Sequence, residues 1–172
     1  MAVDVSAQKM PQVMINQPAG EGPFPLLVIA PAKAYTMTGK LFQELVEGAS
    51  QLGYFVVRFN WSFVTEKQEP SADLSKEVQD LESVIRHFSG HEKVDSNRII
   101  LSAKSFGSKV AMKGAYRLVH GLLLLTPNCD STNTFSDLYA PLFSLNKKVH
   151  IVISAQDPYC DVGQIYTSLS RL

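Results

Sequence analysis

The sequence predicts an α/β protein, a three-layer α/β/α sandwich whose sheet is mostly parallel. Short apolar runs of strand length alternate with longer segments in which apolar residues recur every three or four positions. Proline and glycine separate these segments, at the places where strands and helices end. Strands that alternate with helices indicate βαβ units with right-handed crossovers, and such units build a parallel sheet with helices on both faces.

The first half of the chain begins this alternation. Residues 26–30 are apolar throughout and are bounded by prolines, which is typical of a strand buried on both faces. Gly53 stands where the following helix is expected to stop, and Ser71 is a suitable N-cap for the next one. The elements expected here are an antiparallel edge strand at 12–16, strands at 26–30 and 54–59, and helices over 41–52 and 71–89.

The second half continues the same alternation. Arg-Ile-Ile-Leu-Ser at 98–102 predicts a strand in the middle of the chain. The other elements expected are helices at 106–118, within 135–145 and at 161–172, and strands at 122–126 and 149–154. In a sheet of this kind ligands bind outside the carboxyl ends of the strands, so that rule decides which candidate residues can share a site.

Composition and charge exclude several classes of function. The 172 residues carry 16 Lys and Arg against 16 Asp and Glu, so no basic field favours nucleic acid or an anionic membrane. No apolar run approaches the ~20 residues that span a bilayer, and the N-terminus lacks the pattern of a signal peptide. We therefore expect one cytoplasmic domain over residues 1–172, with 1–10 as a flexible tail.

Nothing in the sequence calls for a metal or a cofactor. Cys129 and Cys160 are too few for a disulfide framework and lack the spacing of zinc ligands. Cys129 follows a predicted strand and is interpreted as a small residue of a pocket wall. Pro-Ala-Lys-Ala at 31–34 replaces the glycine-rich phosphate loop of a nucleotide-binding domain, which leaves that function as a distant third candidate.

One segment has the pattern of a nucleophile elbow. Ser105 follows the strand at 98–102, precedes a helix, and has Ala103 and Gly107 two residues to either side. Small neighbours let the chain turn sharply, so the hydroxyl projects from the end of the strand. The Phe106 N–H and the helix dipole would face an oxyanion there. The alternative is a serine that only caps the helix.

The motifs at the predicted strand ends resemble those of the α/β-hydrolase superfamily, and more narrowly of its small dienelactone-hydrolase-like branch. The resemblance covers most of the chain, from about residue 24 to residue 159. It rests on Leu-Val-Ile-Ala-Pro-Ala (27–32), Val-Val-Arg-Phe-Asn-Trp (56–61), Ala-Lys-Ser-Phe-Gly (103–107) and Ser-Ala-Gln-Asp-Pro-Tyr (154–159). It implies an α/β-hydrolase fold lacking the last strand, and a serine hydrolase that acts on carboxylic esters or related acyl compounds.

The resemblance also implies an acid and an oxyanion hole. Asp157 follows the strand at 149–154, where the family places its acid, and the alternative is a turn or capping residue. The amides of Phe106 and Ala32 would form the oxyanion hole. Pro31-Ala32 stands where the family usually has His-Gly, and proline has no N–H, so the second donor must be Ala32 or a later residue.

The general base is the missing member of the triad. The family places its histidine after one more strand, and no histidine follows Asp157 here. The four histidines are His87, His91, His120 and His150. All are expected near the amino ends of strands, opposite Ser105. We therefore expect weak or absent activity for the chain as it stands, unless residues beyond Leu172 or a partner chain supply the base.

Other residues are expected to border the cleft and to bind substrate, although packing at the rim would explain them equally. They are Lys33, Trp61, Asn128 and Tyr159. A small-molecule ester or acyl compound is the expected partner, with no nucleic acid and no membrane. The second interpretation is a non-catalytic hydrolase-like binding or scaffold protein. The strand at 149–154 would be an exposed sheet edge, which predicts a homodimer through that strand.

Overall fold

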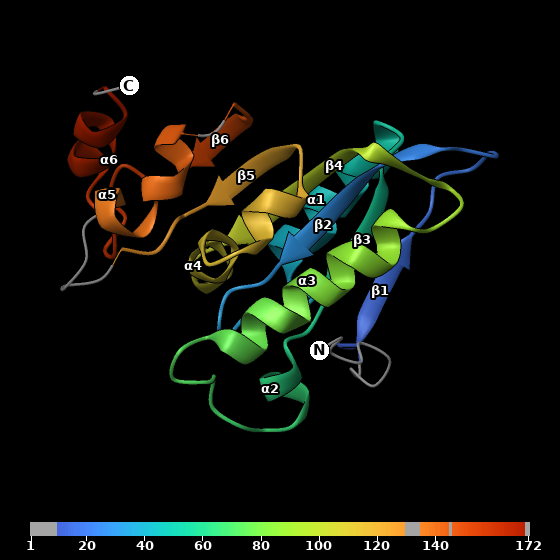
Figure 1. Ribbon diagram of the computed structural model, residues 1–172, viewed down its shortest axis with the longest axis horizontal. Helices are drawn as coiled ribbons and strands as arrows, with labels where there is room; N and C mark the ends of the chain where they lie inside the picture. Colours follow the sequence, from blue (N-terminus) through green and yellow to red (C-terminus); the bar gives the residue numbers. More distant parts are fainter. Residues whose placement is uncertain (1–9, 130–134, 145, 171–172) are drawn as a thin grey trace, which may run out of the picture.

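A six-stranded sheet organises the computed structural model, which describes residues 10–129, 135–144 and 146–170. The strand order is β1-β3-β2-β4-β5-β6 (Figure 1), and every neighbouring pair is parallel except β1 with β3. The strands are β1 Val13–Asn16, β2 Phe24–Ala30, β3 Phe55–Phe59, β4 Val94–Lys104, β5 Gly121–Leu125 and β6 Lys148–Val152. The mostly parallel sheet and its antiparallel edge strand are confirmed. The expected tail falls on residues 1–9, outside the described residues, and on Met10.

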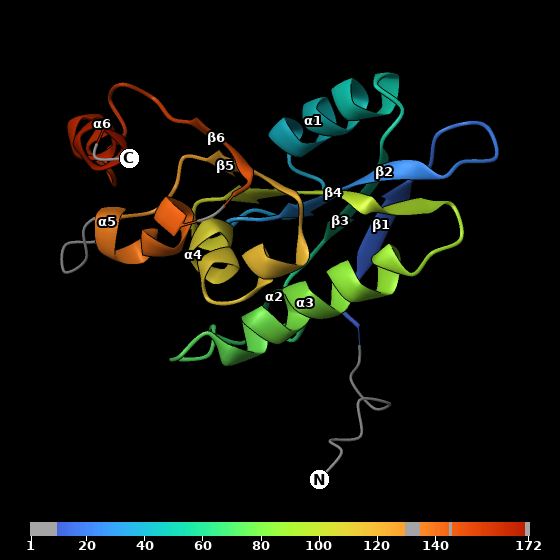
Figure 2. The same cartoon turned by 45° about the horizontal axis from the view of Figure 1, so that its top comes forward.

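Helices cover both faces of the sheet, as Figure 2 shows. On one face lies α1 (Lys40–Gln51), and on the other lie α3 (Ser75–Ser89), α4 (Phe106–Met112) and the 3-10 helix η2 (Ala115–Leu118). A short helix α2 (Ser62–Thr65) follows β3. At the β6 end of the sheet lie α5 (Phe135–Leu138), the 3-10 helix η3 (Ala140–Ser144) and α6 (Val162–Leu169). The three-layer sandwich is therefore confirmed.

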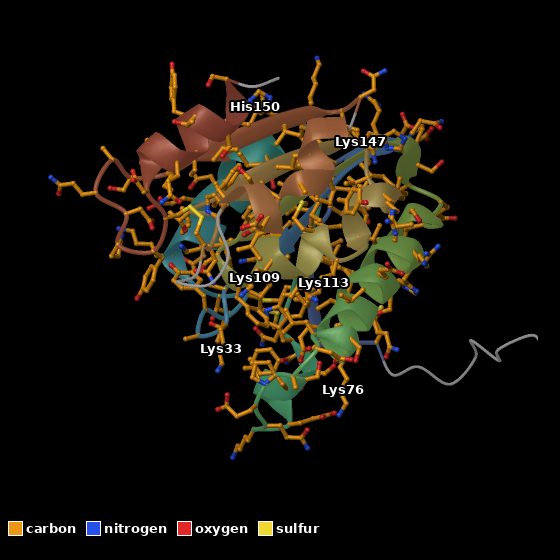
Figure 3. The ribbon with its side chains drawn as sticks, turned by 60° about the vertical axis from the view of Figure 1, so that its left-hand side comes forward. Lys33, Lys76, Lys109, Lys113, Lys147 and His150 are labelled. Carbon is orange, nitrogen blue, oxygen red and sulfur yellow. A yellow bond between two sulfur atoms is a disulfide. The ribbon has the colours of Figure 1, made fainter. Side chains whose placement is uncertain are left out.

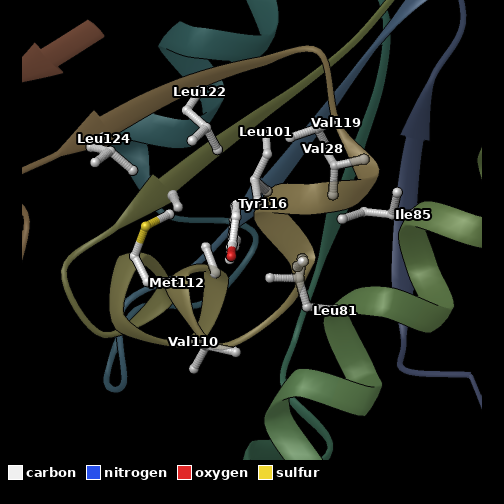
Figure 4. Packing of buried hydrophobic residues seen from close by; sticks show 14 of the residues in the cluster. Val28, Leu81, Ile85, Leu101, Val110, Met112, Tyr116, Val119, Leu122 and Leu124 are labelled. Carbon is white, nitrogen blue, oxygen red and sulfur yellow. The ribbon is translucent and has the colours of Figure 1, made fainter. Parts of the chain in front are cut away.

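The main core lies between the sheet and the layer of α3 and α4 (Figure 4). Val28, Leu101 and Leu122 come from three neighbouring strands and are buried in one cluster with Leu81 and Ile85 of α3. A smaller cluster packs α1 on the opposite face. Because β2 is covered on both faces and paired on both edges, it is apolar along its whole length rather than at alternate positions.

The start of α3 differs from the prediction. Ser71 does not cap this helix, which begins at Ser75 after Leu74 in the left-handed region at φ 63°. The Ser71 hydroxyl instead donates to the Glu77 carboxylate and accepts from the Lys76 N–H. Ser71 thus closes the loop that leads into α3. A capping pattern in the sequence does not distinguish this role from that of an N-cap.

The helix expected over residues 106–118 is also broken in two. It ends at Met112, and the chain continues through Gly114 into η2. A Cβ at Gly114 would lie 2.7 Å from Glu82 Oε1 of α3. The junction between the two helical segments thus passes close to α3, and a residue larger than glycine at position 114 would meet the side chains of α3.

Candidate active site

Ser105 occupies the sharp turn between β4 and α4. Its φ of 47° and ψ of −111° fall in a region that residues other than glycine rarely adopt. The Ser105 N–H donates to the Leu125 carbonyl oxygen at 3.0 Å, which ties the turn to the end of β5. The backbone therefore has the strained geometry that the small–Ser–small pattern predicted, at the carboxyl end of a central strand.

Gly107 shows why a small residue is needed on the helix side of this turn. A Cβ at Gly107 would lie 2.7 Å from the Ala30 carbonyl oxygen and 2.8 Å from the Pro31 carbonyl oxygen. Both are main-chain atoms, so the contact cannot be relieved by rotating a side chain. The close approach brings the turn at the end of β2 against the first turn of α4.

The two amides expected to form an oxyanion hole flank this close approach. The Phe106 N–H belongs to the first turn of α4, where the leading N–H groups have no partner within the helix. Ala32 is half-buried, and its carbonyl oxygen accepts from the Tyr35 N–H at 3.2 Å. The structure thus brings the Phe106 and Ala32 segments to the same end of the sheet.

Trp61 does not line a cleft, which corrects the expectation that it binds substrate. Its side chain is 0% exposed, and its ring packs edge-on against Phe106 with 5.7 Å between centroids. The Trp61 Nε1–H donates to the Pro31 carbonyl oxygen at 3.0 Å. Trp61 therefore supports both sides of the expected oxyanion hole from inside the core.

A buried carboxylate of α3 holds the loop that carries Trp61. The Ser62 N–H and the Ser62 hydroxyl each donate to one carboxylate oxygen of Asp80, both at 2.8 Å. Burial raises the pKa of Asp80, and the hydrogen bonds from Ser62 oppose that shift in part.

A buried hydroxyl network, which was not predicted from the sequence, lies beneath the elbow. The Ser108 hydroxyl donates to the Ser105 carbonyl oxygen and accepts from the Asn128 N–H at 3.4 Å. The Tyr139 hydroxyl lies 2.6 Å from Ser108 Oγ and 3.2 Å from the Asn128 carbonyl oxygen. Burial raises the pKa of Tyr139 to about 12, so this hydroxyl stays protonated at neutral pH. The network joins the elbow to the loop after β5 and to the residue that follows α5.

Asp157 lies in the loop between β6 and α6. It therefore follows the strand after which it is expected from the sequence. Its Oδ1 accepts from the Tyr159 N–H at 2.9 Å and from the Cys160 N–H at 3.1 Å, the pattern of an Asx turn. Among the described residues, no hydrogen bond engages Oδ2. The carboxylate is thus held by one oxygen, and the exposed Tyr159 stands beside it.

A disulfide connects this loop to the loop after β5 (Figure 3). It joins Cys129 to Cys160, with 4.9 Å between their Cα atoms, and both side chains are buried. Cys129, interpreted from the sequence as a small residue of a pocket wall, is therefore one half of a buried disulfide. The two cysteines are 31 residues apart, and their spacing carries no signal that the fold brings them together.

Lys33 lies on the surface and forms an ion pair with Glu69 at 2.7 Å. More than half of the Lys33 side chain is exposed, so it lacks the burial that turns a lysine into a base. It lies at the rim, on the loop that follows β2.

The histidines lie away from Ser105 and Asp157. His150 stands in the middle of β6, level with Leu123 and not at the start of the strand as expected. Figure 3 shows His150 far from Lys33, which marks the loop after β2. His120 precedes β5, and the other two histidines belong to the end of α3 and the turn after it. All four are in the described part of the chain, and none is hydrogen-bonded to Ser105 or Asp157.

Two apolar cavities lie elsewhere, on the α1 face of the sheet. One, of about 410 Å³, is lined by His120, His150 and the starts of β4, β5 and β6. The other, of about 470 Å³, lies beside α1 and shares Ile100 and Leu123 with the first. Neither is lined by Ser105. The described residues include no cluster of His, Cys, Asp and Glu placed to hold a metal ion. They also include no helix with the length and apolarity to cross a bilayer.

Solved structures share this arrangement of strands and helices. The chain is similar to an α/β serine hydrolase homologue from Coxiella burnetii, with 28% identity and a TM-score of 0.73 over 92% of this chain and 75% of that one. It is also similar to a lidless α/β serine hydrolase from Xanthomonas campestris, with 21% identity and a TM-score of 0.71 over 93% and 72%. The esterase domain of a Rhodothermus marinus protein matches with 13% identity and a TM-score of 0.67 over 91% and 74%.

The chain has the α/β-hydrolase fold. Its solved neighbours are α/β serine hydrolase-like proteins, which supports its place in the α/β-hydrolase superfamily. No family model and no curated protein sequence matches the chain.

Proposed function

We propose that this chain is a serine-hydrolase-type protein for carboxylic esters or related acyl compounds, with Ser105 as nucleophile and Asp157 as acid. The observation that carries the proposal is the strained elbow at Ser105, beside the leading N–H groups of α4. Strain of this kind costs about 1–3 kcal/mol and concentrates at functional sites.

The chemistry follows from the position of each group. Ser105 Oγ would attack the acyl carbon, and the amides of Phe106 and Ala32 would receive the negative charge of the carbonyl oxygen. A base must take the hydroxyl proton, and Asp157 Oδ2, which no described residue hydrogen-bonds, would orient that base. Because no histidine of this chain is hydrogen-bonded to Asp157, we expect weak turnover or none from these residues alone.

Within the superfamily we propose the small dienelactone-hydrolase-like branch, in which the chain resembles testis-expressed protein 30. The segments 103–107 and 154–159 support this placement. Lys33, Asn128 and Tyr159 would border a small acyl substrate at the rim, and the proposed location is the cytoplasm.

A non-catalytic binding protein is the second candidate, and the place of the histidines favours it. His150 lies in β6 and helps to line a cavity on the α1 face. In that position it does not serve as a base for Ser105. In this alternative the same strand ends would bind an acyl compound without cleaving it.

A fluorophosphonate probe separates the two candidates. We expect the probe to label the wild type and Ser50→Ala, a control near the end of α1, but not Ser105→Ala. Equal labelling of wild type and Ser105→Ala, or labelling of neither, contradicts the assignment of the nucleophile. Hydrolysis of p-nitrophenyl acetate that disappears in Ser105→Ala excludes the non-catalytic candidate. The rate of hydrolysis by itself does not exclude that candidate, because a protein with an incomplete triad can still accelerate the reaction about 10³–10⁴-fold over water.

A further inference from the structure

The Cys129–Cys160 disulfide connects the support of the elbow with the turn that holds the acid. Cys129 follows Asn128, whose N–H and carbonyl oxygen both belong to the hydroxyl network beneath Ser105. Cys160 donates its own N–H to Asp157 Oδ1 at 3.1 Å. One covalent bond therefore joins the loop that supports the proposed nucleophile to the loop that carries the proposed acid.

The loop that carries Asp157 is otherwise held by its own residues. Between described residues, the hydrogen bonds of 154–161 stay within the loop or reach the first turn of α6. Residues 154–156 and 158–159 are exposed, whereas Cys160 is only 3% exposed. Cys160 is thus the buried anchor of this loop.

We propose that Cys129 and Cys160 form a redox-responsive disulfide, which holds the Asp157 loop in place when oxidised and releases it when reduced. The proposal rests on the proposed function for its catalytic meaning, because it describes the regulation of that same site. Its structural content, the tethering of the loop, stands apart from any activity.

The exchange is carried out by a low-molecular-weight thiol such as glutathione. Its thiolate attacks one cysteine sulfur, the Cys129–Cys160 bond breaks, and a mixed disulfide forms. A second thiol displaces the first, leaving two protein thiols and one small-molecule disulfide, so two electrons and two protons pass to the protein. The reverse reaction with the small-molecule disulfide restores the tether.

The position of Cys160 favours exchange over a permanent crosslink. Cys160 itself is 3% exposed but its neighbour Tyr159 is 71% exposed, so a thiol reaches the sulfur when this exposed loop opens locally. In the cytoplasm, where we expect this chain, disulfides are as a rule transient and redox-sensing.

Amide hydrogen exchange tests the tether directly, because the Tyr159 and Cys160 N–H groups report the Asx turn of Asp157. The full chain is compared after treatment with glutathione disulfide and with tris(2-carboxyethyl)phosphine. We expect no alkylatable thiol in the first state, two in the second, and exchange at these amides about tenfold faster after reduction. The Ser105 amide, bonded to the Leu125 carbonyl, serves as the internal control.

The Cys129→Ser/Cys160→Ser variant is the matched control. Its loop should exchange at the rate of the reduced wild type and should not respond to the reductant. Two free thiols after glutathione disulfide treatment, or equal exchange in both states of the wild type, overturns the proposal.

Fluorophosphonate labelling of Ser105 in the same samples keeps the two proposals separate. Loop exchange that responds to reduction while Ser105 is never labelled supports the tether and refutes the proposed function. Labelling of Ser105 with unchanged loop exchange does the opposite.

Discussion

Gly107→Ala should destabilise the protein although it places a better helix former in a helix. The new Cβ would meet two carbonyl oxygens of the β2 turn at 2.7 and 2.8 Å and a carbonyl carbon at 3.1 Å. Overpacking against atoms that cannot rotate away costs about 1–3 kcal/mol. The gain from replacing glycine in a helix is at most about 1 kcal/mol, and less in the first turn. We therefore expect a net loss of about 1–2 kcal/mol in the free energy of unfolding.

Gly48→Ala is the matched control for this substitution. Gly48 also lies in a helix, α1, but nothing stands within 4 Å of its Cβ position. It should gain about 0.5–1 kcal/mol, so the two variants should move in opposite directions. Urea unfolding gives both values, and thermal unfolding should shift by about 2–4 °C per kcal/mol in a chain of this size. A Gly107→Ala variant as stable as the wild type would refute the steric account of the elbow.

Three further predictions concern the buried network, a buried carboxylate and the sheet edge. Tyr139→Phe removes the hydroxyl that contacts Ser108 and should lower the free energy of unfolding by about 1–2 kcal/mol in urea; an unchanged value would contradict the network's role. Because burial raises the pKa of Asp80 above 3.8, the folded state holds this proton more tightly than the unfolded state. The wild type should therefore lose stability relative to Asp80→Asn as the pH rises from about 4 through the folded pKa, and a constant difference would refute this. We also propose that β6 pairs with β6 of a second copy of the chain. Val152→Lys, at a side chain 56% exposed, should shift a wild-type dimer to monomer in analytical ultracentrifugation. A monomeric wild type would exclude the pairing.

The sheet and the elbow could be predicted because each depends on neighbours in the chain. The apolar run of β2 reflects burial on both faces, and the elbow needs only small residues two positions from Ser105. The start of α3 could not be predicted, because Ser71 satisfies a capping pattern while its hydroxyl bonds to Glu77 instead.

The remaining features depend on contacts between distant segments. Trp61 follows β3 as a rim residue would, and its burial and its bond to the Pro31 carbonyl oxygen depend on segments distant in the sequence. The Ser108–Tyr139 contact and the disulfide of Cys129 each span 31 residues. No local sequence pattern predicts such a pairing, because it depends on which distant segments the fold brings together.

Phe106 connects the proposed chemistry to the hydrophobic core. Its N–H is the proposed oxyanion donor, and its ring packs edge-on against both Trp61 and Phe63. Aromatic packing of two buried residues therefore supports the segment that carries that donor. Changes in the packing of Trp61 or Phe63 should lower kcat while leaving KM nearly unchanged, since the donor matters most when the oxyanion forms. Selection for catalytic rate would then act on core residues whose contacts otherwise serve stability alone.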